Sequence, residues 1–255
     1  MSVVQPSGRP RAAALAGVAV AAVLVIGGII ALAVSNPSHA TSTAAAAPAG
    51  ASCTWKPADA TQNPQVTKTG TPPSKNLPAS GTRAMTLDTS QGTITITLDV
   101  TDAPCSAASF TYLASQKFFD NTTCHRLTTT GIYVLQCGDP TGTGAGGPSY
   151  TYAHENLPTA SVNYPAGTVA MANANDPDGN GSQFFFVYKD TPTDPSTGQS
   201  VLPSNYTVIG KVTGGADVLQ KIAAAGTNNA NGPGDGAPKL PVKITSLTVG
   251  PVVGG

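Results

Sequence analysis

Apolar and polar residues alternate along much of the chain after about residue 83. Between Ala84 and Leu98, two alternating arms flank the turn residues Ser90-Gln91-Gly92, and this pattern predicts a β-hairpin. Shorter runs of the same kind follow, separated by loops rich in glycine and proline. They predict strands at about Ile132–Gln136, Gly167–Asn173, Gln183–Tyr188, Thr207–Val212 and Val242–Val249.

Two segments carry helical patterns instead. Asp102 is predicted to cap the first helix, with Pro104 in its first turn. The second helix is predicted from Ala216 to Ala225, because Gly226 then provides a stop signal. Many short strands with two peripheral helices predict a mainly β fold, a closed barrel capped by helices.

The N-terminal part contains one long apolar run, Ala12 to Val34. A helix of that length crosses a bilayer core of about 30 Å. Arg9 and Arg11 precede it, and the next basic residue is Lys56. By the positive-inside rule, the segment before the run is cytoplasmic and the rest of the chain is outside.

This reading divides the chain into four parts. We expect a cytoplasmic N-terminus at 1–11, a transmembrane anchor at 12–34, an extracytoplasmic linker rich in Ala, Pro and Thr at 35–82, and a folded domain at 83–250. A signal peptide is the alternative for 12–34, because Ser38-His39-Ala40 resembles a cleavage site. The protein would then be secreted rather than held at the cell membrane as a single-pass protein.

Four cysteines lie in the part predicted to be exported: Cys53, Cys105, Cys124 and Cys137. An even number in an oxidising compartment predicts two disulfides, and three pairings are open. Trp55 next to the first cysteine suggests that this stretch docks on the domain. A metal site would need a second ligand motif, which the sequence lacks.

Composition excludes several function classes. Of the 255 residues only 10% are charged, and 13 basic side chains balance 13 acidic ones. A nucleic-acid-binding protein needs a basic surface to neutralise phosphates. A coiled coil needs dense charge beside its apolar seam. A multispan membrane protein needs several long apolar runs. None of these features is present.

Conventional acid–base or nucleophilic chemistry is poorly supported. The domain contains only two histidines, His125 and His154, and no Gly-x-Ser-x-Gly motif. The glycine-rich run Gly142–Gly147 does not lead from a strand into a helix. We therefore interpret it as a flexible wall and not as a phosphate-binding loop. One residue stands out, because Arg126 is the single arginine between Ala84 and Gly255.

Several motifs around that arginine occur in a distinctive order. They are His125-Arg126, Gln136-Cys137-Gly138-Asp139, Met171-Ala172-Asn173-Ala174, Asn180-Gly181-Ser182-Gln183-Phe184-Phe185 and Gly210-Lys211-Val212. Together they resemble the cyclophilin family of peptidyl-prolyl cis-trans isomerases, over about residues 83–250. The resemblance implies an eight-stranded antiparallel barrel capped by two helices, which agrees with the pattern of strands and helices.

The resemblance also implies the roles of particular residues. The catalytic positions of the family fall on Arg126, Gln136, Tyr133, Asn173 and Phe185. The substrate-binding positions fall on Val134, Ala172, Gln183, Leu202, Tyr206 and His125. No cofactor and no metal are implied, because rotation about a peptide bond makes and breaks no covalent bond.

The implied function is acceleration of Xaa–Pro rotation during the folding of exported proteins, with proline-containing polypeptides as partners and a monomer as the expected state. The alternative is a module that binds such segments with little turnover. The chain departs from the family pattern at three places. The Arg126–Gln136 interval is two residues longer, the loop Ala174–Asn180 is one residue longer, and Val201 replaces a tryptophan that helps to hold cyclosporin. Weak cyclosporin binding is therefore expected.

Overall fold

The structure is a computed structural model that describes residues 50–58, 60–61, 65–159 and 164–255. The predicted membrane anchor, residues 12–34, lies outside the described residues. Neither of the two helices within the described ranges combines the length and the hydropathy needed to span a bilayer.

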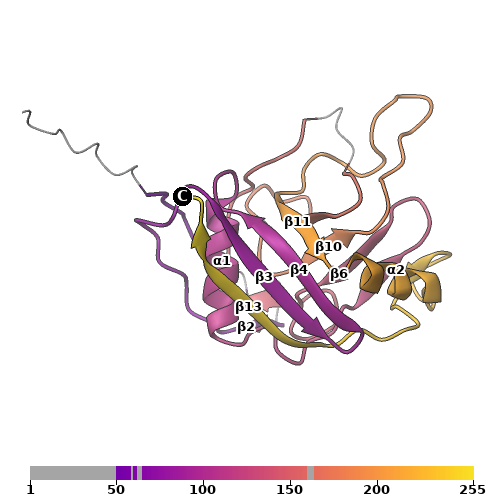
Figure 1. Ribbon diagram of the computed structural model, residues 1–255, viewed down its shortest axis with the longest axis horizontal. Helices are drawn as coiled ribbons and strands as arrows, with labels where there is room; N and C mark the ends of the chain where they lie inside the picture. The colour runs from indigo at the N-terminus through magenta and orange to yellow at the C-terminus, as the bar shows by residue number, and fades with distance from the viewer. Residues whose placement is uncertain (1–49, 59, 62–64, 160–163) are drawn as a thin grey trace, which may run out of the picture. The chain divides into compact units, whose positions relative to one another are not determined.

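The predicted hairpin forms the longest pair of strands, β3 (Thr82–Thr89) and β4 (Gly92–Asp99). Its alternating residues place one face of each strand against the core, where Met85 pairs with Ile96 and both are fully buried. Figure 1 shows the two strands side by side, with β13 (Ile244–Val253) along the other edge of β3. The alternation predicted this hairpin because one face is buried and the other is exposed.

The hairpin belongs to a nine-stranded antiparallel sheet with the order β12-β5-β6-β10-β9-β11-β4-β3-β13. Each of the four strands predicted after the hairpin and before the last one is present, with ends that differ by one or two residues. The remaining strands are β5 (Arg126–Thr128), β6 (Val134–Cys137), β9 (Thr168–Met171), β10 (Phe184–Val187), β11 (Val208–Gly214), β12 (Asp235–Gly236) and β13 (Ile244–Val253).

The sheet has one strand more than the eight expected. It has nine strands, and in the part of the chain that the structure describes no ladder joins the end strands β12 and β13. One isolated bridge, Thr123 to Lys243, connects the segment before β5 with the segment before β13. The coarser prediction, a mainly β fold with two helices, is confirmed.

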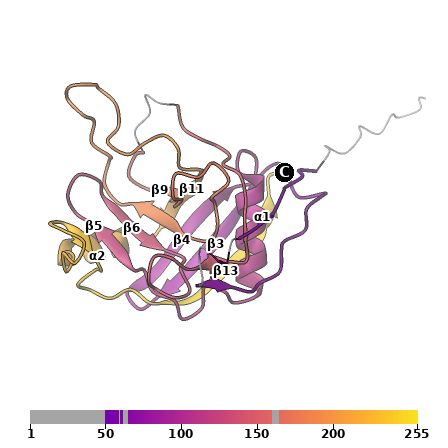
Figure 2. The same cartoon turned by 180° about the vertical axis from the view of Figure 1, so that it is seen from behind.

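Two helices lie against the sheet at different places, as Figures 1 and 2 show. Helix α1 (Pro104–Ser115) buries Phe110 and Leu113. Helix α2 (Ala216–Ala225) has the predicted bounds and ends at Gly226, whose φ of 76° is favourable for glycine. Helix α1 therefore begins at a proline, and α2 lies between Gly215 and Gly226, all signals that the sequence carries.

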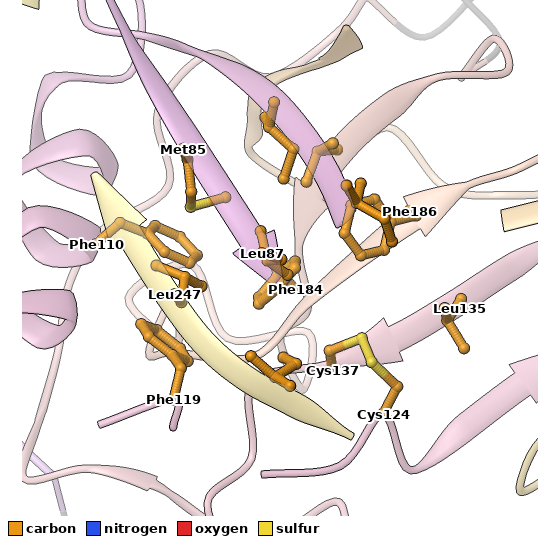
Figure 3. Packing of buried hydrophobic residues seen from close by; sticks show 14 of the residues in the cluster. Met85, Leu87, Phe110, Phe119, Cys124, Leu135, Cys137, Phe184, Phe186 and Leu247 are labelled. Carbon is orange, nitrogen blue, oxygen red and sulfur yellow. A yellow bond between two sulfur atoms is a disulfide. The ribbon is translucent and has the colours of Figure 1, made fainter. Parts of the chain in front are cut away.

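The main core lies between α1 and one face of the sheet (Figure 3). Phe110 of α1 stacks on Phe119 with ring centroids 5.5 Å apart, and Phe184 of β10 meets Phe110 edge-on at 5.4 Å. The disulfide between Cys124 and Cys137 lies in the same core and joins the segment before β5 to β6. The aromatic cluster and this disulfide together hold β5, β6 and β10 in place.

An N-terminal strap, defined as residues 50–58 and 65–81, lies along the domain. The second disulfide, Cys53–Cys105, joins the strap to the first turn of α1. Of the three possible pairings, the structure therefore has Cys53–Cys105 with Cys124–Cys137. Trp55 packs edge-on against Tyr150 and Tyr152, as the docking prediction implied. Two short strand pairs complete the attachment: β1 (Lys56–Pro57) with β8 (Tyr150–Thr151), and β2 (Val66–Thr67) with β7 (Gly147–Pro148).

The start of α1 differs from the prediction. Ala103, not Asp102, is the N-cap residue, and its side chain cannot cap the helix. The carboxylate of Glu155 accepts hydrogen bonds from the amides of Ser106 at 2.6 Å and Cys105 at 3.2 Å. The only glutamate of the chain thus satisfies two amide groups that the helix itself leaves without partners.

Replacing Glu155 by alanine should lower the free energy of unfolding by about 1–2 kcal/mol, because two half-buried amides lose their acceptor. Urea unfolding at neutral pH measures this change. Asp102→Ala is the matched control and should change the free energy by less than about 0.5 kcal/mol. An equal loss in both variants would show that Asp102 also stabilises the helix start.

Candidate functional site

A row of side chains crosses four neighbouring strands on the sheet face opposite the main core. Arg126 of β5 pairs in register with Gln136 of β6, which pairs with Phe185 of β10, which pairs with Ala170 of β9. Directly opposed residues of antiparallel strands point to the same face. The register therefore brings Arg126, Gln136 and Phe185 together, as the sequence motifs implied.

Arg126 is held by a carboxylate that sequence reasoning missed. Its Nε donates to Oδ1 of Asp235 at 2.8 Å, and its Nη2 donates to Oδ2 at 2.6 Å. This bidentate bond raises the pKa of Arg126, and it is also the main cause that lowers the pKa of Asp235. In the described part of the chain no hydrogen bond involves Nη1, which leaves one edge of the guanidinium available to a ligand.

Gln136 and Gln183 form a second polar pair beside the arginine. Nε2 of Gln136 donates to Oε1 of Gln183 at 2.8 Å. Nε2 of Gln183 in turn donates to the carbonyl oxygens of Gly144 at 3.0 Å and Gly146 at 2.9 Å. The orientation of both predicted glutamines is therefore set by the loop that contains these glycines.

That glycine-rich loop is organised around a buried carboxylate. Asp139 is 0% exposed and accepts hydrogen bonds from the amides of Thr141 at 2.7 Å and Gly144 at 2.6 Å. Burial by itself raises the pKa of Asp139, but the hydrogen bonds from the loop outweigh burial and lower it below 3.8. A Cβ on Gly146 would overlap Oδ1 of Asp139, so this position requires glycine. The run expected to be a flexible wall is thus a fixed loop.

A second apolar cluster lies on the same face as the row. It consists of Val134, Tyr164, Ala170, Phe185, Val187 and Leu202, with Ile132, Ala172, Tyr206 and Val208 packed against it. Phe185 and Leu202 are only 4% and 5% exposed, and the ring of Tyr206 meets Phe185 edge-on at 5.3 Å. This cluster brings together five predicted site residues: Val134, Ala172, Phe185, Leu202 and Tyr206.

Tyr133, predicted as the aromatic floor of this cluster, lies elsewhere. Its ring packs against the main core, 6.0 Å from the ring of Tyr188, with Nζ of Lys189 4.3 Å from its centroid. Strand alternation explains the difference, because Val134 and Gln136 face the site and their neighbours face the core. Ile132 packs on the second cluster instead, and the same alternation could have identified it from the sequence.

Asn173 borders the site at the end of β9. Its Nδ2 donates to the carbonyl oxygen of Asn205 at 3.0 Å, and its Oδ1 accepts from the amide of Asn175 at 2.9 Å. The amide of Ala172 donates to the carbonyl oxygen of Gln183 at 2.9 Å. The backbone of the two predicted residues therefore lies directly beside Gln183.

His125 contacts the loop rather than the second apolar cluster. A Cβ on Gly144 would lie 3.5 Å from Cδ2 of His125, so the ring is adjacent to that glycine. Both ring nitrogens are buried, and neither has a hydrogen-bond partner among the described residues. Burial lowers the pKa of His125, although the charge of Asp139 raises it. These contacts place His125 behind the site.

A cavity of about 550 Å³ adjoins the glutamine pair. Gln136, Asn173 and Gln183 contribute to its wall, and so do Ala58, Gln65 and Val66 of the N-terminal strap. The remaining lining residues are mostly glycine, alanine, serine and threonine. The site thus has two neighbouring parts, an apolar cluster and a larger polar cavity.

Comparison with known proteins agrees with this arrangement. The family profile described as "Cyclophilin type peptidyl-prolyl cis-trans isomerase/CLD" matches residues 84–249. The "Probable peptidyl-prolyl cis-trans isomerase B" of Mycobacterium tuberculosis is 42% identical over 212 residues, which cover 78% of this chain and 64% of the relative. The protein of the same name in Mycobacterium leprae is 44% identical, with 65% and 56% covered. The chain thus spans less than two thirds of these relatives.

Two further comparisons concern a shorter relative and a solved structure. The "Peptidyl-prolyl cis-trans isomerase-like 1" of Emericella nidulans is 34% identical, covering 63% of this chain and 93% of the relative. A crystal structure of a cyclophilin-type peptidyl-prolyl cis-trans isomerase from Cryptosporidium parvum superposes with a TM-score of 0.53 at 24% identity, covering 68% and 99% of the two chains. This second comparison supports the fold alone.

The loop around Asp139 predicts a particular dependence of stability on pH. Because the pKa of Asp139 is lowered in the folded protein, its carboxylate stabilises the fold above pH 3.8, and this stabilisation is lost as the pH falls through the folded-state pKa. The free energy of unfolding should fall below about pH 4, less steeply in Asp139→Asn than in the parent. Urea unfolding between about pH 2 and pH 6 measures both slopes.

The matched control is Asp217→Asn, which changes an exposed aspartate of α2. It should follow the slope of the parent. If the parent and Asp139→Asn gave the same slope, the loop would not depend on the ionised carboxylate.

Proposed function

Because the chain belongs to the cyclophilin family, shown by the family match over residues 84–249, we propose that it is a peptidyl-prolyl cis-trans isomerase that accelerates Xaa–Pro rotation in exported polypeptides. The observation that carries the proposal is the row Arg126, Gln136 and Phe185 beside the second apolar cluster. Proline isomerisation is slow enough to limit folding, so such an activity has a use wherever chains fold after export.

The geometry suits a reaction that makes and breaks no bond. The barrier to rotation is about 18–20 kcal/mol, because amide resonance is lost in the twisted state. Acceleration requires a surface that binds the twisted state more tightly than either planar state. An apolar recess for the pyrrolidine ring and a fixed donor near the prolyl nitrogen supply these two interactions.

The second apolar cluster is the proposed recess for the proline ring. Val134, Phe185 and Leu202 are 3%, 4% and 5% exposed. We assign Ile132, in place of Tyr133, to this recess. The backbone at Ala172 and Asn173 is the proposed contact for the flanking peptide, with Gln183 at its border. Tyr206 contributes the rim above Phe185.

Arg126 is the proposed catalytic donor. Asp235 holds its Nε and Nη2, so the guanidinium has a fixed plane and presents Nη1. A donor in that position stabilises the lone pair of the prolyl nitrogen as resonance is lost. Lysine would not reproduce this geometry, because its ammonium group is a point charge on a flexible stem.

One observation favours the alternative function, a module that binds proline-containing segments with little turnover. The bidentate bond to Asp235 occupies two of the three guanidinium nitrogens. If substrate binding required that bond to break, catalysis would be slow while the apolar cluster still bound proline. A turnover measurement separates the two functions.

We also propose where the protein acts and how its sheet is closed. The two disulfides and the apolar run 12–34 support an extracytoplasmic domain, either tethered at the cell membrane by one span or secreted after cleavage. The bond from the amide of Ile244 to the carbonyl oxygen of Thr122, 2.8 Å long, supports closure of the sheet as a barrel. We expect the protein to act as a monomer.

Cyclosporin sensitivity is proposed to be weak. Val201 is 41% exposed and has much less apolar surface than the tryptophan it replaces. Protease-coupled isomerisation of a Xaa–Pro peptide in the presence of cyclosporin checks this proposal. Inhibition at low drug concentration would contradict it.

Arg126→Ala should lower kcat/KM by about 100-fold or more, because a charged donor aimed at the rotating bond is lost. Arg126→Lys should lose most of the same activity. Protease-coupled isomerisation of a Xaa–Pro peptide, catalysed by the full chain, measures both. Arg83→Ala is the matched control, since Arg83 donates to the carbonyl oxygen of Gly250 and lies outside the site.

A folded parent that gave no acceleration would contradict the isomerase proposal. Binding of the same peptide without acceleration would then support the alternative module. Equal losses in the Arg126 and Arg83 variants would indicate a general loss of structure rather than a lost donor.

Adjacent residues before and within β6 should affect different properties. Val134→Ala removes two methyl groups from the proposed recess and should raise KM by about five- to tenfold, since each buried methylene contributes about 0.8 kcal/mol. Tyr133→Ala should lower the melting temperature while KM stays within about twofold, because the ring packs on the core. Steady-state kinetics and thermal unfolding of both variants test this. A raised KM in Tyr133→Ala would contradict this assignment and indicate that Tyr133 contributes to the recess.

A further inference from the structure

The N-terminal strap is an addition to the part of the chain that matches the family. The match begins at residue 84, whereas the strap comprises residues 50–58 and 65–81. It is nonetheless firmly attached. The Cys53–Cys105 disulfide fixes it to α1, and an ion pair joins Lys56 to Asp178. These attachments hold the strap in place against the conformational entropy that it loses on ordering. The strap is therefore a structural part of the domain.

The strap contacts the loop that orients the active-site glutamines. Oε1 of Gln65 accepts hydrogen bonds from the hydroxyl groups of Thr141, at 2.9 Å, and Thr143. The carbonyl oxygens of Gly144 and Gly146 in the same loop hold Gln183. The strap therefore stabilises the glycine-rich loop, and this loop in turn orients Gln183.

The second strand of the strap pairs with the end of that loop. Val66 lies opposite Gly147 and Thr67 lies opposite Pro148 in a parallel register. The amide of Thr69 donates to Oγ of Ser149 at 3.2 Å. This pairing fixes Val66 at the cavity, whereas its neighbour Thr67 is exposed and does not line it.

The described part of the wall of the cavity next to the glutamine pair carries no charge. None of the described residues that line it is an aspartate, glutamate, lysine or arginine. A charged side chain that entered would lose water and meet no opposite charge among these described lining residues, which is costly. An uncharged side chain would bury its surface against Val66 and the small residues opposite.

We propose that the strap determines substrate specificity, with Val66 as the residue that selects uncharged side chains next to the substrate proline. This inference rests on the proposed function, because the cavity is assigned to the residues that flank the proline. The occupant is an uncharged side chain of the polypeptide substrate, seated between the strap and the Gln136–Gln183 pair.

The test uses the full chain and matched Xaa–Pro peptides that carry alanine, leucine, glutamate or lysine at each position next to the Xaa–Pro unit. The parent should favour the alanine and leucine peptides over the charged ones. Val66→Lys should raise kcat/KM for the glutamate peptide, relative to the alanine peptide, by about fivefold, because the wall then carries the opposite charge. A gain of this kind cannot result from partial unfolding.

Thr67→Lys is the matched control, with the same new charge one residue away on the exposed side of the strand. It should leave the glutamate-to-alanine ratio within about twofold of the parent. An equal rise in both variants would overturn the proposal, since a general surface charge would explain it. Val66→Trp is the second variant and should reduce kcat/KM for the leucine peptide more than for the alanine peptide.

Calorimetric binding of the same peptides distinguishes this inference from the proposed function. If no peptide were isomerised, the isomerase proposal would fail. The strap proposal would still be supported if Val66→Lys, and not Thr67→Lys, improved binding of the glutamate peptide. Equal discrimination in the parent and both Val66 variants, in binding and in turnover, would overturn it.

Discussion

The register of β5, β6 and β10 is the constraint on which the rest of this structure depends. It divides consecutive residues between two faces, so that Phe184 and Phe186 enter the main core while Phe185 faces the site. A slip of one residue would exchange the faces and remove both the core and the site. The aromatic packing on α1 and the Cys124–Cys137 disulfide stabilise the register from the core side (Figure 3).

The polar side chains of the site are held in place by hydrogen bonds to other groups, and these groups are hydrogen-bonded in turn. Gln136 is oriented by Gln183, Gln183 by two loop carbonyl oxygens, and the loop by the buried carboxylate of Asp139. Arg126 has its own support in Asp235. A catalytic surface for amide rotation must be rigid, because it acts through small differences in binding between planar and twisted states. Such a network provides that rigidity.

The strap and the extended loops are additions to this common arrangement. Cys53, Trp55 and Val66 lie far from the family motifs in sequence, yet they attach to α1, to Tyr150 and to the loop beside Gln183. These contacts place residues from outside the matched region at the wall of the cavity. The family fold accounts for the proposed chemistry, and the additions would account for the choice of substrate.

The sequence by itself determined the features that depend on neighbouring residues. The hairpin at Ala84–Leu98 and the helix at Ala216–Ala225 follow from periodicity and stop signals, and motif order predicted Arg126, Gln136 and Phe185 as site residues. Only the tertiary structure decided which cysteines pair, that Glu155 rather than Asp102 serves the start of α1, and that Asp235 holds Arg126. Apart from Cys124–Cys137, these contacts join residues 49 to 109 positions apart. Local pattern carries no information about such distant partners, because packing and register bring them together only after the chain has folded.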